Sequence, residues 1–205
     1  MSTSRLDHDH PARPSIPPSL AFERALRLAA VGHRDQVRKG SETPYIEHPM
    51  AVALILDRSG FDEEVVIAGL LHDLVEDTDV TLDEICRSFG GRVASIVEGC
   101  SEKKVDAEGR KRPWSDRKRD HVAVVSRSSD DVQAVVLADK LHNLISIELD
   151  LSDNRPVWSS FHADRTQVLA YYEAMLAACE SRDSRLTRLL DECRARLRQV
   201  ASMDG

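Results

Sequence analysis

Apolar side chains recur every three or four residues along most of this 205-residue chain, and this period constrains its fold more than any other feature. Such spacing is that of one face of an α-helix, whereas a half-buried β-strand would alternate at every second residue. We find no convincing alternating segment and no internal repeat. The sequence therefore predicts an all-α fold, built as a helical bundle.

The expected helices share this apolar period and are separated by turn and loop residues. They are expected at residues 20–33, 50–56, 65–75, 85–89, 93–97, 121–125, 132–149, 165–179 and 185–200. The TLDE sequence at residues 81–84 predicts a capping box at a helix start, and Gly90-Gly91 predicts the end of that helix. Residues 38–49 and 102–120 lack the period, and irregular segments on a helical scaffold often carry binding groups.

The length of the chain allows one substantial core, so one folded domain is the default expectation. We expect a disordered N-terminal tail at residues 1–18, a helical domain at 19–182 and a charged C-terminal helix at 183–205. The tail is rich in Pro, Ser and charge and has no apolar signal core. No apolar run in the chain reaches the length of a membrane span, so we expect no membrane partner.

Charge and cysteine usage narrow the class of protein further. The formal net charge of −7 argues against a general nucleic-acid-binding protein. The four cysteines, which are Cys86, Cys100, Cys179 and Cys193, form no CxxC pair. Without an export signal they indicate reduced thiols in a cytoplasmic protein. The sequence leaves open whether the chain forms a homo-oligomer.

One stretch, LLHDLVEDTD at residues 70–79, places four polar side chains close together. In a continuous helix His72 would stack beneath Glu76, and Asp73 beneath Asp77, with the apolar residues on the other side. Carboxylates gathered in this way repel one another unless a cation compensates them or a proton neutralises one. A divalent metal ion supplies such a cation, while a solvated acidic helix end with a capping histidine is the alternative.

Two further motifs add candidate metal ligands. YIEHP puts His48 just before a proline suited to a first helical turn, where a lone histidine is more often structural than a ligand. In VLADKLHNL, Asp139 lies within apolar surroundings, and Lys140 is expected to point a different way, so a metal ion is the better partner for the carboxylate. His48, His72, Asp73 and Asp139 would give two imidazoles and two carboxylates. This set fits Mn, Fe, Co or Zn, and the share of carboxylates favours Mn.

Together these motifs resemble a known family. The order H…HD…D is typical of the HD-domain metal-dependent phosphohydrolases, a helical superfamily. Three longer strings are similar to the hydrolase domain of the RelA/SpoT-type alarmone enzymes and to the stand-alone small alarmone hydrolases. They are GHRDQVRKGSETPYIEHPMAVALIL, AGLLHDLVEDTDVTLDEICRSFG and LADKLHNL. The resemblance covers residues 21–149 and, more loosely, extends to 180. It implies an HD-domain helical bundle in the short form, without synthetase and regulatory domains.

The resemblance also implies a role for each matching residue. Metal ligands fall on His48, His72, Asp73 and Asp139, the catalytic acid pair on Glu76 and Asp77, and substrate contacts on Arg38, Lys39, Lys104 and Asn143. The implied reaction is hydrolysis of the 3′-diphosphate of (p)ppGpp, the alarmone of the stringent response, to GDP or GTP and diphosphate. The linker before PYI and the segment after Cys100 differ from the better-known members.

The residues themselves are consistent with this chemistry. A bound cation lowers the pKa of a water, and Glu76 and Asp77 stand where they can orient that water and accept its proton. Basic residues for phosphate contacts come from RK at residues 38–39, KK at 103–104 and GRKRPWSDRKR at 109–119, although the last is equally typical of a solvated surface. Two alternatives stay open: an HD phosphatase acting on another nucleotide, such as NADPH or a deoxynucleotide, and a nucleotide sensor without catalysis. The sensor is disfavoured because all six metal and acid positions are filled.

Overall fold

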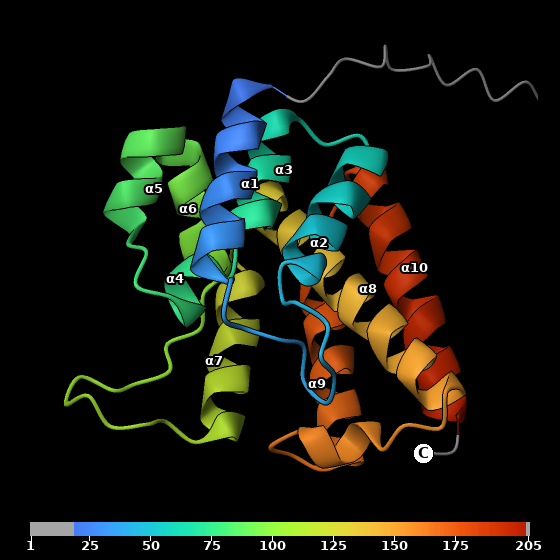
Figure 1. Ribbon diagram of the computed structural model, residues 1–205. Helices are drawn as coiled ribbons and strands as arrows, with labels where there is room; N and C mark the ends of the chain where they lie inside the picture. The colour runs from blue at the N-terminus through green and yellow to red at the C-terminus, as the bar shows by residue number, and fades with distance from the viewer. Residues whose placement is uncertain (1–18, 204–205) are drawn as a thin grey trace, which may run out of the picture.

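The computed structural model describes residues 19–203, and this part of the chain is helical with no extended strand (Figure 1). The all-α prediction is therefore confirmed, whereas the tail expected at residues 1–18 lies outside the described residues. The elements are α1 (Leu20–Gly32), α2 (Glu47–Arg58), α3 (Glu63–Leu71), α4 (Leu74–Asp77), α5 (Leu82–Phe89), α6 (Gly91–Cys100), α7 (Trp114–Val125), α8 (Asp130–Ser152), the 3₁₀-helix η1 (Val157–Ser160), α9 (Arg165–Ala178) and α10 (Ser184–Ser202).

Local sequence signals determine several helix ends. The predicted capping box is present at the start of α5, where the Thr81 side chain accepts the Glu84 N–H and the Glu84 side chain accepts the Thr81 N–H. Gly90 ends α5 with a φ of 94°, a conformation that other residues rarely adopt. Ser19 caps α1 by accepting the N–H of Phe22. The capping box and the glycine lie in the sequence itself, which is why both ends of α5 could be predicted.

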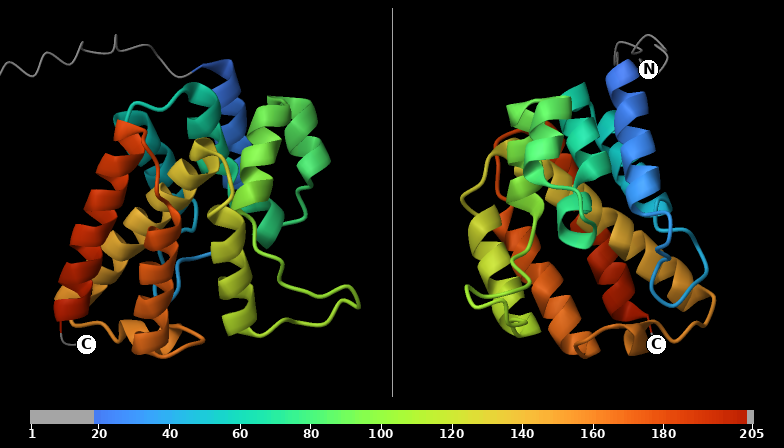
Figure 2. Two further views of the ribbon diagram at one scale, coloured as in Figure 1. Left: turned by 180° about the vertical axis from the view of Figure 1, so that it is seen from behind. Right: turned by 60° about the vertical axis from the view of Figure 1, so that its left-hand side comes forward.

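The long helix α8 runs through the middle of the molecule and packs against α2, α3, α6 and α10 (Figures 1 and 2). Helix α3 is covered by α1, α2, α6 and α8, so every residue from Val65 to Leu71 is buried. Helix α10 lies along α8 and buries Leu186, Leu190 and Leu197. Each such side chain stabilises the fold by roughly 1.5–3 kcal/mol when fully buried. Helices α7 and α9 lie side by side at one end of the bundle (Figure 2).

The helix expected at residues 65–75 is interrupted, and the prediction of one continuous helix is wrong. Helix α3 ends at Leu71, and α4 begins at Leu74. The Gly69 carbonyl, which the Asp73 N–H would bond in a continuous helix, accepts a hydrogen bond from His72 Nδ1 at 2.7 Å. His72 and Asp73 keep right-handed helical backbone angles, so the chain continues in nearly the same direction. The break leaves both side chains on a turn rather than on a helix face.

Helix α7 begins at Trp114, seven residues before the apolar period at residues 121–125 predicts. Residues 115–120 are polar or charged, so they carry no period although they are helical. The expected loop at 102–120 is therefore shorter than predicted. Helices α1, α2, α5, α6, α8, α9 and α10 agree with their predicted bounds to within three residues at each end.

Two further expectations concern the class of protein. The four cysteines are free thiols, as predicted, and all but Cys86 are buried. Within residues 19–203, no helix is both long enough and apolar enough to cross a membrane.

Candidate metal centre and active site

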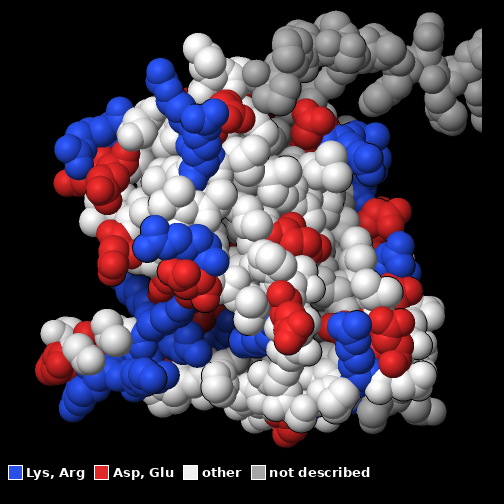
Figure 3. Space-filling model, in the orientation of Figure 1, with Lys and Arg blue, Asp and Glu red and all other residues white. Residues whose placement is uncertain are grey.

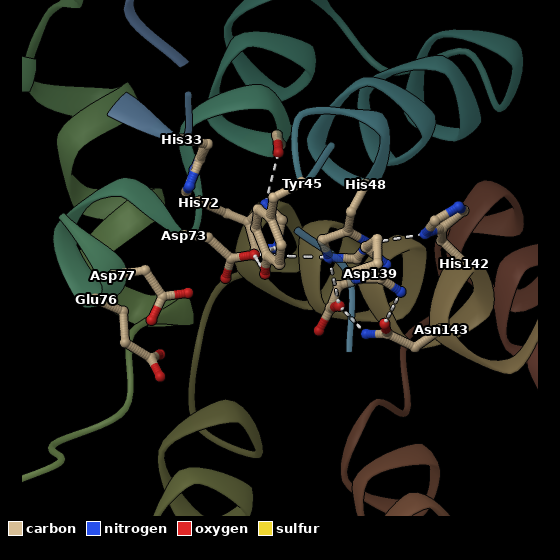
Figure 4. Close-up of polar contacts among 12 residues, drawn as sticks. His33, Tyr45, His48, His72, Asp73, Glu76, Asp77, Asp139, His142 and Asn143 are labelled. Carbon is tan, nitrogen blue, oxygen red and sulfur yellow. Dashed lines mark hydrogen bonds and ion pairs between the residues drawn. The ribbon is translucent and has the colours of Figure 1, made fainter. Parts of the chain in front are cut away.

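The predicted site residues converge on one cavity of about 1270 Å³. His48 comes from the first turn of α2, and His72 and Asp73 come from the turn between α3 and α4 (Figure 4). Asp139 comes from the middle of α8. The two neighbouring side chains on the turn after Leu71 thus line the same cavity.

The donor atoms of these four side chains lie close together. One ligand atom each of His48, His72 and Asp139 lie within 4.8 Å of one another. Asp73 joins them, since its Oδ2 is 3.2 Å from His72 Nε2 and 3.6 Å from His48 Nε2. Asp139 Oδ1 is 3.2 Å from His48 Nε2. The four predicted ligands are therefore in one place, and their role as ligands remains a prediction.

His72 shows that this donor set fits a cation. Its Nδ1 donates to the Gly69 carbonyl, which can only accept, so a neutral His72 carries its lone pair on Nε2. This Nε2 is buried and forms no hydrogen bond, although Asp73 Oδ2 is 3.2 Å away. A lone pair facing a carboxylate oxygen is repulsive, and a divalent cation bound by both atoms removes that repulsion.

The ionisation of the ligands agrees with metal binding. Burial lowers the pKa of His48, because desolvation disfavours the imidazolium, and this outweighs the opposing effect of Asp139. Burial alone would raise the pKa of Asp139, but the Lys140 ammonium brings it well below its ordinary value. At neutral pH the site thus offers a neutral imidazole and a carboxylate, which are the forms that bind metal ions.

The interpretation that Lys140 points away from Asp139 is wrong. Its Nζ donates to Asp139 Oδ2 at 2.6 Å, and the whole side chain is buried. Tyr171 of α9 lies over the ammonium, with its ring centroid at 5.5 Å, so the lysine has no open route to solvent and turns to the adjacent carboxylate. Asn143 also donates to Asp139. The burial of Asp139 is therefore no evidence for a metal ion, because Lys140 and Asn143 already compensate the carboxylate. The evidence is the buried His72 Nε2, which has no hydrogen-bond partner.

The predicted acid pair lies on α4, next to the ligands (Figure 4). Glu76 is held by two groups: its Oε2 accepts the N–H of Glu102 at 3.1 Å, and its Oε1 lies 3.2 Å from Lys104 Nζ. Asp77 accepts a hydrogen bond from Lys104 Nζ at 2.5 Å. Burial raises the pKa of Glu76, although the Glu102 N–H and Lys104 oppose the change. A raised pKa makes a carboxylate a better proton acceptor at neutral pH.

The four predicted substrate contacts all line the cavity, but they occupy different parts of it. Arg38 Nη2 donates to Asn143 Oδ1 at 2.9 Å, so these two side chains are joined. Lys39 lies apart from them, with its Nζ 5.7 Å from the ring centroid of Phe161. Lys104 lies beside the acid pair. The substrate-binding roles of all four remain predictions.

Sequence reasoning missed two contacts within the site. The Tyr45 hydroxyl donates to Asp73 Oδ2 at 2.6 Å. Glu102 forms an ion pair with Lys118 and lies 3.4 Å from Arg117, with its side chain only 6% exposed. An acidic residue at the start of a basic run was the available signal for Glu102. No local signal joins Tyr45 to a residue 28 positions further along the chain.

Comparisons with known proteins agree with this geometry. The model of the family described as HD domain matches residues 25–166. The guanosine-3′,5′-bis(diphosphate) 3′-pyrophosphohydrolase MESH1 of Danio rerio is 40% identical over 151 residues, covering 72% of this chain and 76% of that protein. The protein of the same name from Mus musculus is 41% identical, covering 73% and 77%. A solved structure described as "A metazoan ortholog of SpoT hydrolyzes ppGpp and plays a role in starvation responses" aligns with a TM-score of 0.72 and 32% identity, covering 89% of this chain and 98% of the other.

Proposed function

Because the chain belongs to the HD domain family, we propose that it is a metal-dependent phosphohydrolase that removes the 3′-diphosphate from (p)ppGpp and releases GDP or GTP. The family resemblance read from the sequence motifs is confirmed. One observation supports the proposal above all. The unpartnered His72 Nε2 lies in the same cavity as the carboxylates of the predicted ligands and the acid pair on α4. The printed names of the relatives support the choice of substrate.

In this proposal His48, His72, Asp73 and Asp139 hold one divalent cation. When bound, the cation polarises a water molecule and lowers its pKa toward neutrality. Two imidazoles and two carboxylates, with further positions open to water and substrate, suit Mn better than an all-sulfur or all-nitrogen set would. We therefore propose Mn²⁺ as the metal ion in the active protein.

Glu76 accepts a proton from the attacking water in this mechanism. The Glu102 N–H and the Lys104 ammonium fix the direction of its carboxylate, so little reorganisation is needed when the proton moves. Asp77 shares Lys104 with Glu76 and helps to orient the same water. Lys104 neutralises part of the negative charge that two adjacent carboxylates present to a phosphate substrate.

Basic side chains supply the contacts for the substrate phosphates. Arg38 and Lys39 line the cavity on the side of the loop before α2, while Lys104, Lys111 and Arg112 line it on the side of the loop between α6 and α7. Figure 3 shows basic residues gathered around this projecting loop, on a surface whose charges are otherwise mixed. Cations on both sides of the ligands suit a substrate with phosphate groups at both its 3′ and 5′ ends.

A nucleotide panel tests the proposal. Purified protein is incubated with Mn²⁺ and with ppGpp, NADPH or deoxynucleoside triphosphates, and the products are separated by ion exchange. We expect ppGpp to give GDP and diphosphate only when the metal ion is present. Cleavage of NADPH or of a deoxynucleotide with ppGpp left intact would assign a different substrate. Binding of ppGpp without cleavage would indicate the sensor.

The remaining expectations about cellular context are part of the same proposal. We propose a cytoplasmic location, where thiols such as the four free cysteines stay reduced. The absence of nucleic-acid binding remains a prediction from the net charge. The oligomeric state remains open.

A further inference from the structure

A chain of two hydrogen bonds connects His48 to the edge of the cavity. His48 Nδ1 lies 2.7 Å from His142 Nδ1 (Figure 4), and His142 Nε2 lies 3.0 Å from Glu47 Oε1. Both imidazoles are buried, whereas the Glu47 side chain is 46% exposed. A predicted ligand is thus tied through a second histidine to a carboxylate that reaches solvent.

The chemistry of these groups gives the chain a direction. The Glu47 carboxylate can only accept, so His142 Nε2 must carry the proton that joins them. A neutral imidazole that donates from one nitrogen accepts at the other, so His142 Nδ1 accepts. His48 Nδ1 therefore donates, and the lone pair of His48 is left on Nε2. That atom lies 3.2 Å from Asp139 Oδ1, inside the candidate metal centre.

We propose that Glu47 and His142 are positioning residues that hold His48 in the tautomer whose Nε2 lone pair faces the metal centre. The inference rests on the proposed function, because it gives that lone pair a metal ion to bind. His72 reaches the same tautomer through the Gly69 carbonyl, a backbone group that no substitution removes. His48 depends on side chains for its tautomer, so its orientation can be changed by substitution.

These hydrogen bonds also connect the candidate metal centre to Arg38, a predicted substrate contact. Arg38 Nε lies 3.9 Å from the second oxygen of Glu47, and Arg38 donates to Asn143, which donates to Asp139. Glu47 is therefore held between Arg38 on one side and His142 on the other.

The tautomers can be read directly in the metal-free protein. With ¹⁵N-labelled histidine and a pH above about 6.5, the ordinary pKa of the side chain, two-bond ¹H–¹⁵N spectra distinguish a protonated ring nitrogen from one with a lone pair. We expect protons on Nδ1 of His48 and on Nε2 of His142. A proton on Nε2 of His48 would overturn the proposal, whatever the activity of the protein.

Glu47→Lys tests the direction of the chain through metal affinity. An ammonium can only donate, so it would reverse both hydrogen bonds and place a proton on His48 Nε2. We expect the affinity for Mn²⁺, measured by calorimetric titration of the metal-free protein, to fall about 10- to 100-fold, the usual effect of losing a group that orients a ligand. Glu47→Gln keeps an acceptor oxygen, so its affinity should stay closer to that of the unsubstituted protein.

Glu63→Lys is the matched control. Glu63 is exposed in the first turn of α3, as Glu47 is in the first turn of α2, so the change in charge and the effect on the helix dipole are the same. We expect the control to bind Mn²⁺ as the unsubstituted protein does. Equal affinities of Glu47→Lys and Glu63→Lys would refute the positioning role alone. Failure of the unsubstituted protein to bind Mn²⁺ would refute the proposed function. If Glu47→Lys does not fold, which circular dichroism reveals, the spectra of the unsubstituted protein decide.

Discussion

Lys140→Met would remove the only ammonium that contacts Asp139 within the described residues while keeping the length of the side chain. The carboxylate would stay nearly buried, with its side chain 14% exposed, and would keep its close contacts with the amide of Asn143 and the imidazole of His48. Removing one partner of a buried ion pair typically costs about 3–5 kcal/mol, because the other charge is left uncompensated. The folded metal-free protein should therefore lose a large part of its stability.

Protonation of Asp139 limits this loss and makes it depend on pH. At pH 7, about three units above the ordinary carboxyl pKa near 3.9, protonation costs about 4 kcal/mol. At pH 5 the same step costs only about 1.5 kcal/mol. For a chain of this length about 1 kcal/mol corresponds to 2–4 °C, so we expect the melting temperature to fall by roughly 6–16 °C at pH 7 and by roughly 3–6 °C at pH 5.

Thermal unfolding followed by circular dichroism, in chelator and at both pH values, measures this effect. Saturating Mn²⁺ should reduce the loss, because the metal ion then compensates Asp139 in place of the ammonium. Lys140→Arg keeps a cation, and Lys39→Met removes an exposed one from the same cavity, so both controls should change the melting temperature far less. A loss that is the same at pH 5 and pH 7 would refute the view that an unpaired Asp139 carboxylate causes it.

Three further predictions concern catalysis. Glu76→Gln and Asp77→Asn should each retain the metal ion, measured by elemental analysis, and lose about 10²–10⁴ in rate; normal rates would assign the pair to structure. Because burial raises the pKa of Glu76, the kcat/KM profile should fall on its acidic side as pH drops through that raised pKa, and Glu76→Gln should lack this limb. Neutralising Arg38 or Lys39 should weaken use of ppGpp about 10- to 100-fold more than use of a singly phosphorylated ester, since a desolvated charge-assisted contact contributes roughly 1.5–3 kcal/mol; equal losses would make both cations ordinary surface charge.

The helices could be predicted where burial leaves a period in the sequence. Helix α10 shows this well, since its buried leucines recur along one side and its other side is charged. The first turns of α7 could not be predicted, because residues 115–120 are polar or charged and a helix with little apolar content carries no period. The interruption after Leu71 could not be predicted either, because His72 and Asp73 keep helical backbone angles and the apolar pattern continues through them.

The sequence indicated which residues gather at the candidate site. It did not indicate which side chains contact one another there. Asp139 stands out because a carboxylate in apolar surroundings needs a partner, and His72 and Asp73 stand out because several carboxylates gather within two turns. The direction of Lys140 depends on Tyr171 of α9, which lies over the ammonium. This contact joins α8 to α9, which are distant in the sequence, so no local sequence pattern predicts it.

The metal centre is held in place by the protein itself, which predicts how the fold responds to metal removal. Each predicted ligand has a partner other than the metal ion: His142 for His48, the Gly69 carbonyl for His72, Tyr45 for Asp73, and Lys140 with Asn143 for Asp139. A chelator should therefore abolish activity and lower the melting temperature, because a bound ion stabilises the native state by mass action. It should leave the helical circular dichroism almost unchanged, because the partners keep the ligands in place. Extensive loss of helix in chelator would show that the metal ion, and not these partners, organises the turn between α3 and α4. An unchanged melting temperature would instead show that no ion binds at this centre.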